Sequence, residues 1–314
     1  MRSPDKFMST LVVLQQMIVI FLLILSGFAL TKLNLIGKNA AGIMSSLVVY
    51  ITNPAIQISS VLGENSKVTH ADVLYMLLVT LVIYIILTIL GIVLPRLFGV
   101  QKAERCFYNL MTVYVNSGFI GLPLVLAVLG SEAVIYATIF NLVYTFWFYT
   151  HGIIVLQKGR SGEKEKIDLK KIFNIGTISG IIAILIFWFG WRLPTVFEDT
   201  ITYMGRATTF LAMAVLGVNL AGISLKSLFT DIRLLVYSLV RLLALPIAIG
   251  TILRIILGDS LMMDVFILLI AMPAGNLPLM AANQYNMKAE TLTRGILLTT
   301  ILSLVTITGV VALV

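Results

Sequence analysis

Long apolar stretches separated by short polar connections run from one end of the chain to the other. Ten such stretches occur, at about 9–31, 41–62, 71–95, 105–130, 133–156, 173–191, 200–224, 232–257, 261–285 and 290–313. A helix needs about 20 apolar residues to cross the hydrocarbon core of a bilayer, and nearly all of these stretches reach that length. The pattern therefore predicts an all-α integral membrane protein with ten transmembrane helices.

One connection is longer and strongly charged, "KGRSGEKEKIDLKK" at 158–171. It predicts a division into a first five-helix unit (1–157), a cytoplasmic linker (158–172) and a second five-helix unit (173–314). Because five is an odd number, a second copy of a five-helix unit must insert upside down. The chain is thus expected to contain two inverted repeats, an arrangement found in many secondary transporters.

Lysine and arginine are distributed unevenly between the two sets of connections. Fifteen of the 22 fall on one side, at positions 32, 38, 96, 102, 105, 158, 160, 164, 166, 170, 171, 226, 233, 288 and 294. Five fall on the side of the termini, at positions 2, 6, 67, 192 and 254. Basic residues are retained on the cytoplasmic side, so both termini are expected outside the cytoplasmic (inner) membrane.

Two of the apolar stretches are interrupted in the same way. The fourth contains "NSGFIGLP" at 116–123 and the ninth contains "MPAGNLP" at 272–278, so Pro123 and Pro278 lie 155 residues apart. Proline removes a backbone donor and glycine relaxes helical geometry. One such residue in a membrane helix is ordinarily a kink, whereas two matched breaks in an inverted repeat favour a binding site at a helix crossing.

A crossing of this kind would leave two half-helix N-termini near the middle of the membrane. Each carries about half a positive charge and unpaired N–H groups, which suit an anion. Asn116 and Asn276 would add amide contacts without burying a charge. Asn53, in "TNPA" of the second stretch, and Asn219, in "GVNLA" of the seventh, are expected to contribute from neighbouring helices.

Charged side chains inside the predicted spans are few. All 14 Asp and Glu fall in connections or within about two turns of a span end, which argues against tight coupling to protons or sodium through a central carboxylate. Arg241 lies near the middle of the eighth span. It either binds or gates an anion or pairs with carbonyls or a distant carboxylate. Arg206 is shallower and is expected to extend toward the interface.

The composition agrees with this prediction. The chain has 314 residues, of which 59% are hydrophobic and 11% charged, with a mean hydropathy of +1.04. The net charge of +8 reflects basic connections and not a nucleic-acid-binding face, so no nucleic-acid partner is expected. A single cysteine and two separated histidines argue against a metal site, and no cofactor or catalytic motif is evident.

Three segments carry a resemblance to a known family: "ITNPAIQISSVL" at 51–62, "NSGFIGLPLVLAVLG" at 116–130 and "AMPAGNLPLMAANQYN" at 271–286. With the five-plus-five pattern, the chain resembles bacterial members of the auxin efflux carrier family, relatives of the plant PIN auxin transporters. The resemblance implies a fold like that of bile acid symporters and sodium–proton antiporters, with helices four and nine crossed. It makes the crossover positions Asn116, Gly121, Pro123, Pro273, Gly275, Asn276 and Pro278, with Asn53 and Pro54 facing them.

The same resemblance implies a scaffold of helices 1, 2, 6 and 7 and a moving transport domain of helices 3–5 and 8–10, with a homodimer as one assembly. Bacterial members are associated with small organic anions such as malonate or malate, and plant members with indole acetate. The predicted function is a secondary carrier that moves a small mono- or dicarboxylate by alternating access. The alternatives are a sodium- or proton-coupled symporter of the bile acid type and a non-transporting membrane sensor. An intramembrane enzyme would need mid-span catalytic groups, and the sequence has none.

Overall fold

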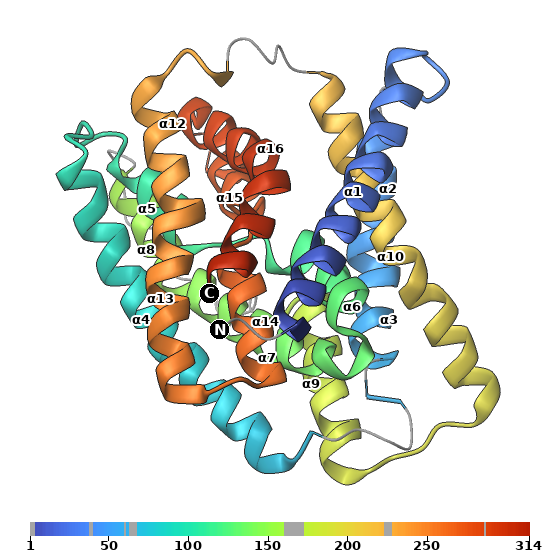
Figure 1. Cartoon of the computed structure of the whole chain (residues 1–314). Helices are drawn as coiled ribbons and strands as arrows, with labels where there is room; N and C mark the ends of the chain where they lie inside the picture. The colour runs from blue at the N-terminus through green and yellow to red at the C-terminus, as the bar shows by residue number, and fades with distance from the viewer. Residues whose placement is uncertain are drawn as a thin grey trace.

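The computed structural model describes residues 4–37, 40–59, 61–62, 68–159, 173–222, 228–285 and 287–314. Within these ranges the chain is all-helical, as predicted, apart from one isolated β-bridge (Figure 1). The first half contains α1 (Pro4–Lys32), α2 (Ala40–Leu47), η1 (Val48–Thr52), α3 (Asn53–Ser59), α4 (His70–Leu97), α5 (Arg105–Val113), η2 (Ser117–Gly121), α6 (Leu122–Leu129), α7 (Ser131–Trp147), η3 (Phe148–Gly152) and α8 (Ile153–Gly159). The second half contains α9 (Ile175–Phe189), α10 (Thr195–Ala221), α12 (Ile232–Leu239), η5 (Val240–Ala244), α13 (Leu245–Leu257), α14 (Leu261–Ile270), α15 (Leu277–Gln284) and α16 (Glu290–Leu313).

Seven helical stretches in the described residues are long and apolar enough to cross a membrane. They are Leu14–Lys32, Ala40–Ser59, His70–Leu97, Ser131–Gly159, Thr195–Ala221, Ile232–Leu257 and Glu290–Leu313, and each matches one of the ten predicted spans. The other three predicted spans contain the shorter apolar helices Ser117–Leu129, Ile175–Phe189 and Leu261–Ile270. Two of these three are the spans in which the sequence predicted breaks.

Several helices begin where polar side chains satisfy their first N–H groups. Thr69 and Asp72 form a reciprocal capping box at the start of α4, with N–H···O distances of 3.2 and 2.8 Å. Asn174 caps α9 through the N–H of Thr177, and Asp231 caps α12 through the N–H of Leu234. These caps hold the helix ends at the polar edges of the molecule. The predicted linker 158–172 lies outside the described residues from position 160 onward.

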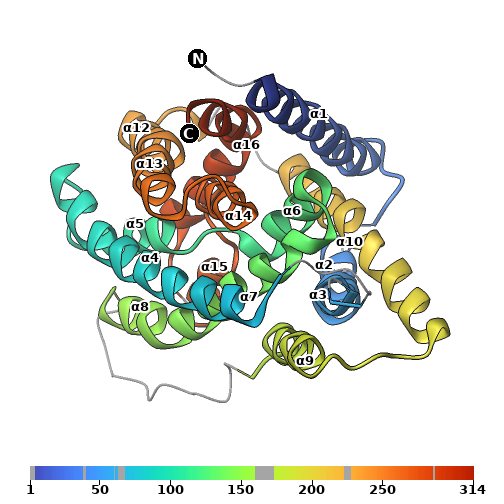
Figure 2. The same cartoon turned by 60° about the horizontal axis from the view of Figure 1, so that its bottom comes forward.

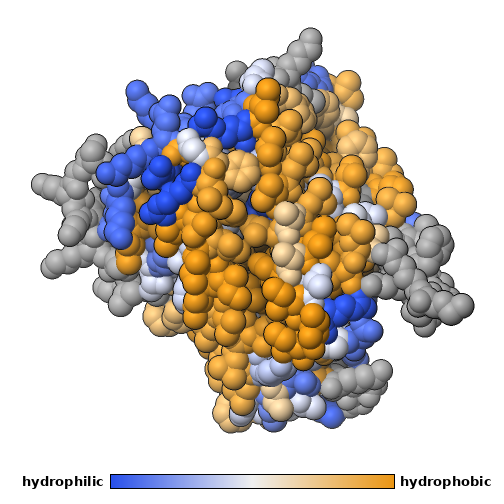
Figure 3. Space-filling view, turned by 60° about the vertical axis from the view of Figure 1, so that its left-hand side comes forward, coloured by the Kyte–Doolittle hydropathy of each residue, from blue (hydrophilic) through white to orange (hydrophobic). Residues whose placement is uncertain are grey.

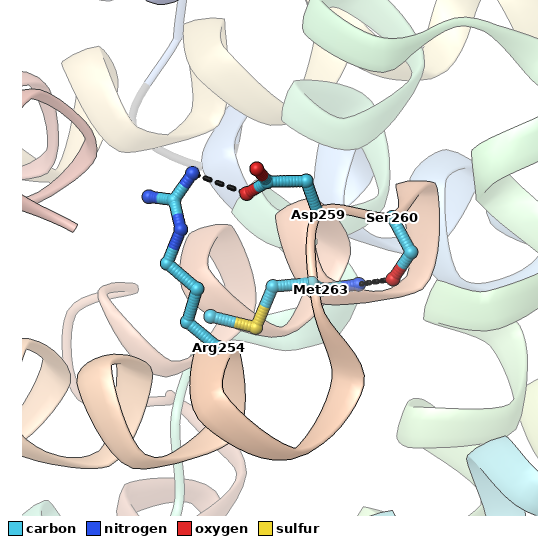
Figure 4. A network of polar contacts seen from close by, with 4 residues as sticks. All are labelled: Arg254, Asp259, Ser260 and Met263. Carbon is cyan, nitrogen blue, oxygen red and sulfur yellow. Dashed lines mark hydrogen bonds and ion pairs between the residues drawn. The ribbon is translucent and has the colours of Figure 1, made fainter. Parts of the chain in front are cut away.

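The connection between α13 and α14 shows how one tight turn is held (Figure 4). Arg254, in the last turn of α13, pairs with Asp259, and Ser260 caps α14 through the N–H of Met263 at 3.2 Å. Gly258 adopts a positive φ of 64°, a backbone conformation that residues with side chains rarely adopt. The turn thereby reverses the chain within three residues.

Two groups of helices can be distinguished in Figures 1 and 2, and they meet where α1 packs against α16 and α9 packs against α7. In the first group α10 packs against α1, α2 and α3, and α3 packs against α9. The contact between α1 and α10 is a backbone contact, because a Cβ added at Gly217 would lie 1.9 Å from Ile24 O, and one at Gly27 would lie 2.1 Å from Ala214 O. Small residues at such positions let membrane helices approach closely.

The second group holds the interrupted spans and the most continuous buried core. Here α4 packs against α5 and α7, α14 against α7 and α13, and α16 against α5 and α12. Its centre is aromatic: Tyr84 contacts the rings of Phe140, Tyr144 and Trp147. The breaks in the fourth and ninth spans are therefore surrounded by protein and not by lipid, where unpaired backbone groups would be costly.

The outer surface is apolar between two polar ends. The face seen from the left of Figure 1 carries a continuous hydrophobic band with hydrophilic residues above and below it (Figure 3). Helix α4, at the left of Figure 1, exposes large apolar side chains along its length, among them Leu74, Leu78, Val82, Ile85 and Ile89. A surface of this kind suits contact with lipid tails.

Contacts at the helix ends bring together connections that the distribution of lysine and arginine placed on the same side of the membrane. At one end Arg233 donates to Gly99 O at 3.2 Å, Thr291 donates to Glu104 at 2.9 Å and Arg294 donates to Thr230 at 3.1 Å. At the opposite end of α4, His70 stacks on Trp188 at the end of α9, with ring centroids 4.4 Å apart. The basic positions 2, 38, 67, 160, 164, 166, 170, 171 and 226 of that count lie outside the described residues.

Candidate functional site

The two interrupted spans meet through their backbones. Val115 and Ala274 form an antiparallel bridge, in which Asn116 N donates to Pro273 O and Gly275 N donates to Tyr114 O, both at 2.8 Å. The segments between α5 and η2 and between α14 and α15 are therefore extended and pair with each other. This pairing satisfies backbone groups that the helix breaks would otherwise leave open.

The residues at the bridge explain why the chain departs from helix there. Pro273 has no N–H and offers only its carbonyl, which it uses in the bridge. Gly275 allows the two backbones to approach, because a Cβ at this position would lie 2.8 Å from Val115 O and 3.1 Å from the Tyr144 hydroxyl. Both residues are buried.

Downstream of the bridge each span resumes as a second helix. The first resumes as the π-helical turn η2, in which Gly121 N donates to Asn116 O at 2.9 Å, and Pro123 follows directly in α6. A Cβ at Gly121 would lie 2.8 Å from the Leu269 side chain, so this position also requires close packing. The second resumes as α15, where Pro278 is the second residue, a place that needs no N–H.

Asn116 and Asn276 lie directly before these two resumed helices. Asn116 is 3% exposed and caps η2, because its Oδ1 accepts from Phe119 N at 3.2 Å. Its Nδ2 is buried and has no hydrogen-bond partner in the described part of the chain. Asn276 is half-buried and immediately precedes Leu277, the first residue of α15. Both amides therefore stand at the N-terminal ends of helices.

Asn53 reaches the same place from the second span. It is 9% exposed, its buried Oδ1 has no partner among the described atoms, and its Nδ2 lies 3.8 Å from a Cβ added at Gly118. Pro54 follows in the first turn of α3 and is half-buried. The first helix group thus brings an amide to the N-terminal end of helix Ser117–Leu129.

Two side chains of the fifth span also reach the bridge, and neither is among the residues predicted from the sequence. Asn141 Oδ1 accepts from Ser117 Oγ at 2.9 Å and lies 3.5 Å from a Cβ added at Gly118. Tyr144, three residues later and on the same face of α7, places its hydroxyl near Gly275. Asn141 is an amide inside a predicted span, so the criterion that selected Asn53 would also have selected it.

Tyr114, which flanks the bridge, contacts the imidazole of His151 through its hydroxyl. Its hydroxyl lies 2.9 Å from His151 Nδ1 and donates to Trp147 O at 3.1 Å. His151 lies in η3, one of four π-helical turns in the described residues. Two other π-helical turns lie next to polar residues. The turn η1 ends directly before Asn53, and η5 contains Arg241. Turns of this type widen a helix locally and are frequent at functional sites.

Arg241 is fully buried beside the bridge, at 1% exposure. Its Nε donates to Met111 O at 3.3 Å and its Nη1 donates to Ile270 O at 2.9 Å. Met111 lies in the last turn of α5 and Ile270 is the last residue of α14, so one guanidinium contacts the C-terminal ends of both upstream half-helices. Its Nη2 is buried and has no hydrogen-bond partner among the described atoms. Two of the three guanidinium nitrogens therefore pair with carbonyls, one of the two roles expected from the sequence, and the third is left open to a ligand.

Asn219 is not brought to this site. It is exposed in the last turn of α10, whereas the part of α10 beside Asn53 is eleven residues earlier, at Thr208, which donates to Thr52 O at 2.8 Å. Eleven residues of α-helix extend roughly 16 Å. Thr208 follows Asn53 by 155 positions, which is also the spacing between Pro123 and Pro278. Arg206 is exposed, as expected.

The comparisons with known proteins agree with this picture. A family model described as "Membrane transport protein" matches residues 12–311. The chain belongs to this family of transporters. It is 24% identical to an uncharacterised transporter of Methanocaldococcus jannaschii, over 92% of this chain and 95% of that protein. It is 26% identical to a putative malonate transporter of Rhizobium meliloti, over 94% and 93% of the two chains.

The family assignment confirms the resemblance to auxin efflux carriers and identifies the protein as a membrane transport protein and not an enzyme. The transporter therefore handles a small molecule in a membrane. Among the residues that the structure describes, no three His, Cys, Asp or Glu side chains gather to hold a metal ion. The polar groups at the bridge are amides, hydroxyls, helix ends and the Arg241 guanidinium, all of which can form hydrogen bonds.

Proposed function

We propose that the protein is a secondary carrier that moves a small organic anion across the cytoplasmic membrane by alternating access. The observation that carries this proposal is the Val115–Ala274 bridge, which sets the N-terminal ends of two helices in the protein interior. Helix N-termini attract anions through unpaired N–H groups and the helix dipole. Amides at Asn116, Asn276 and Asn53 supply further hydrogen bonds at the same place.

The proposed architecture is a ten-helix inverted repeat with crossed fourth and ninth spans. Three observations support it. The fourth and ninth predicted spans are the interrupted ones, they pair with each other, and Thr208, which donates to Thr52 O, follows Asn53 by the same 155 positions that separate Pro123 from Pro278. Discontinuous helices that meet at a repeat interface are typical of substrate sites in secondary transporters. The basic connections would face the cytoplasm and both termini the outside.

The two packing groups suggest which parts move. We assign α1, α2–α3, α9 and α10 to a scaffold and the remaining helices to a transport domain that carries the bridge. The scaffold then contributes Asn53, while the transport domain contributes Asn116, Asn141 and Asn276. A substrate that contacts both sides would couple its own binding to the movement of one group against the other.

A small carboxylate is the substrate class that the site favours. The described part of the bridge region offers no carboxylate and no metal ligand set, and its polar atoms suit carboxylate oxygens. The relative from Rhizobium meliloti is named a putative malonate transporter, so malonate is the first compound to test.

The decisive experiment measures uptake or exchange of labelled malonate and other small carboxylates by the purified protein in liposomes. Asn116→Ala and Asn276→Ala are each expected to reduce transport about tenfold or more, since each removes an amide at a helix end. The matched control is Asn219→Ala, which removes the same amide at an exposed position and is expected to transport normally. Transport at the wild-type level by both Asn116→Ala and Asn276→Ala would contradict the proposed site.

A further inference from the structure

Four helix ends meet at the bridge, and each carries a partial charge. A side chain compensates the partial charges of two of these ends and not those of the other two. The upstream half-helices α5 and α14 end at the bridge, and the C-terminal end of a helix carries about half a negative charge. Arg241 donates to a carbonyl at each of these two ends, at 3.3 and 2.9 Å, and its Nη2 is buried without a partner among the described atoms. One positive charge is thus placed against about one negative charge in total.

The downstream half-helices have no such compensation. Helices Ser117–Leu129 and Leu277–Gln284 begin at the bridge, and each N-terminal end carries about half a positive charge. Every Asp and Glu in the described part of the chain lies in a connection, at a helix start or within the first five residues of a helix, so none opposes these two ends. About one unit of positive charge therefore remains for a ligand.

Two buried side-chain atoms beside helix Ser117–Leu129 lack partners, and they differ in kind. Asn116 Nδ2 is a donor without an acceptor, and Asn53 Oδ1 is an acceptor without a donor. Both residues are more than nine-tenths buried, and both adjoin the start of that helix. A ligand that satisfies both atoms must offer an oxygen acceptor and also an O–H or N–H donor.

We propose that the carrier binds and moves monovalent anions, and that it takes a dicarboxylic acid in its singly protonated form. This inference rests on the proposed function. A hydrogen dicarboxylate has one charge, a carboxylate that accepts from Asn116 and the N–H groups, and a carboxyl O–H that donates to Asn53. A fully ionised dicarboxylate would bring a second, uncompensated charge into the membrane interior and no donor. Arg241 acts as a positioning residue, which neutralises the two carbonyl ends through its Nε and Nη1.

The test uses the full-length protein in liposomes at equal pH inside and outside, with labelled malonate and with monomethyl malonate, whose charge is fixed at one above its single ionisation. The KM for total malonate should rise about tenfold per pH unit above the second ionisation of malonic acid, and should be constant when expressed as hydrogen malonate. The KM for the monoester should be higher than that for hydrogen malonate, because the ester has no O–H to donate to Asn53, and it should not change with pH. A malonate KM that is independent of pH would overturn the proposal.

The monoester also separates titration of the ligand from titration of the protein. The titratable groups near the bridge are Tyr84, Tyr114, Tyr144, His151 and Arg241, and of these His151 is the one whose ordinary range lies near neutral pH. Equal pH dependence for malonate and the monoester would place the titration on the protein and overturn the proposal. Absence of uptake for both compounds at every pH would instead contradict the proposed function.

Arg241 provides a second test. Arg241→Gln should raise the KM of the monoester at least tenfold, because the two carbonyl ends would then weaken the positive potential, and Arg241→Lys should restore it to within about threefold. Thermal unfolding with and without ligand shows whether the variants are folded, and Arg206→Gln, at an exposed position, is the control. A folded Arg241→Gln protein with an unchanged KM would overturn the assigned role.

Discussion

Asn116 shows how single residues define this site. One end of its amide caps a helix by accepting from Phe119 N, and the other end is buried without a partner among the described atoms. A buried unpaired amide is costly, and in the proposed function a ligand that pairs with Asn116 and Asn53 would offset that cost. Gly275 is equally specific, since its missing side chain allows the backbone of the ninth span to contact that of the fourth.

A methyl group at Gly275 should separate the two backbones. Gly275→Ala places a Cβ about 2.8 Å from Val115 O, so the bridge must shift. The expected result is a loss of stability of about 1–3 kcal/mol together with a large loss of transport. Thermal unfolding and liposome uptake measure the two effects. Gly42→Ala is the control, because a Cβ there meets no atom within 4 Å, and equal behaviour of the two variants would contradict this role of Gly275.

At the scale of elements, breaks and close contacts matter more than helix length. The first helix of the fourth span ends at Val113 and that of the ninth span ends at Ile270, because the segments that follow them pair with each other. Proline and glycine make that pairing possible. Between α1 and α10, Gly27 and Gly217 have no side chain, so the two helix backbones contact each other directly. The positions of proline, which lacks an N–H, and of glycine, which lacks a side chain, thus determine helix ends and helix contacts as much as the apolar periodicity does.

Gly217→Ala tests the contact between α1 and α10. Its Cβ would lie 1.9 Å from Ile24 O, a backbone atom that cannot rotate away, so the two helices must separate. Destabilisation by about 1–3 kcal/mol is expected, with a lower yield of folded protein in detergent. Substrate affinity in the protein that does fold should change little, because Gly217 is two residues from Asn219 and far from the bridge. A fully stable variant would show that the contact is looser than described.

At the scale of the whole molecule, two helix groups share one site. The interface between them includes Asn53 against Gly118 and Gly180 of α9 against Leu142 of α7. If the groups move against each other during transport, contacts across this interface must break and re-form. Contacts within a group, such as Ser59 with Gly205, should persist.

A disulfide across the interface should stop transport. A Cβ at Gly180 would lie 3.1 Å from Leu142 Cγ, which brings the pair Leu142→Cys and Gly180→Cys within reach of a disulfide. The chain has one cysteine, Cys106, which is first replaced by serine. Oxidation is expected to abolish uptake and reduction to restore it.

The pair Ser59→Cys and Gly205→Cys is the control for that experiment. It joins α3 to α10 within the scaffold group, where the Ser59 hydroxyl lies 3.0 Å from a Cβ added at Gly205. Oxidation of this pair should leave transport intact. Undiminished uptake by the oxidised Leu142–Gly180 pair would contradict the assignment of fixed and moving groups.

The sequence by itself determined the membrane class, the positions of the seven long apolar helices in the described residues and the two places where helices break. These features depend on local composition and on residues without donors or side chains. It also selected Asn53, Asn116 and Asn276 as polar groups inside apolar stretches. Only the tertiary structure decided that Val115 pairs with Ala274, that Arg241 contacts two carbonyls, that Asn141 accepts from Ser117 beside the bridge and that Asn219 lies away from it. Those contacts require atoms from distant parts of the chain to come within about 3 Å of each other, and such distances are set by packing and not by any local pattern.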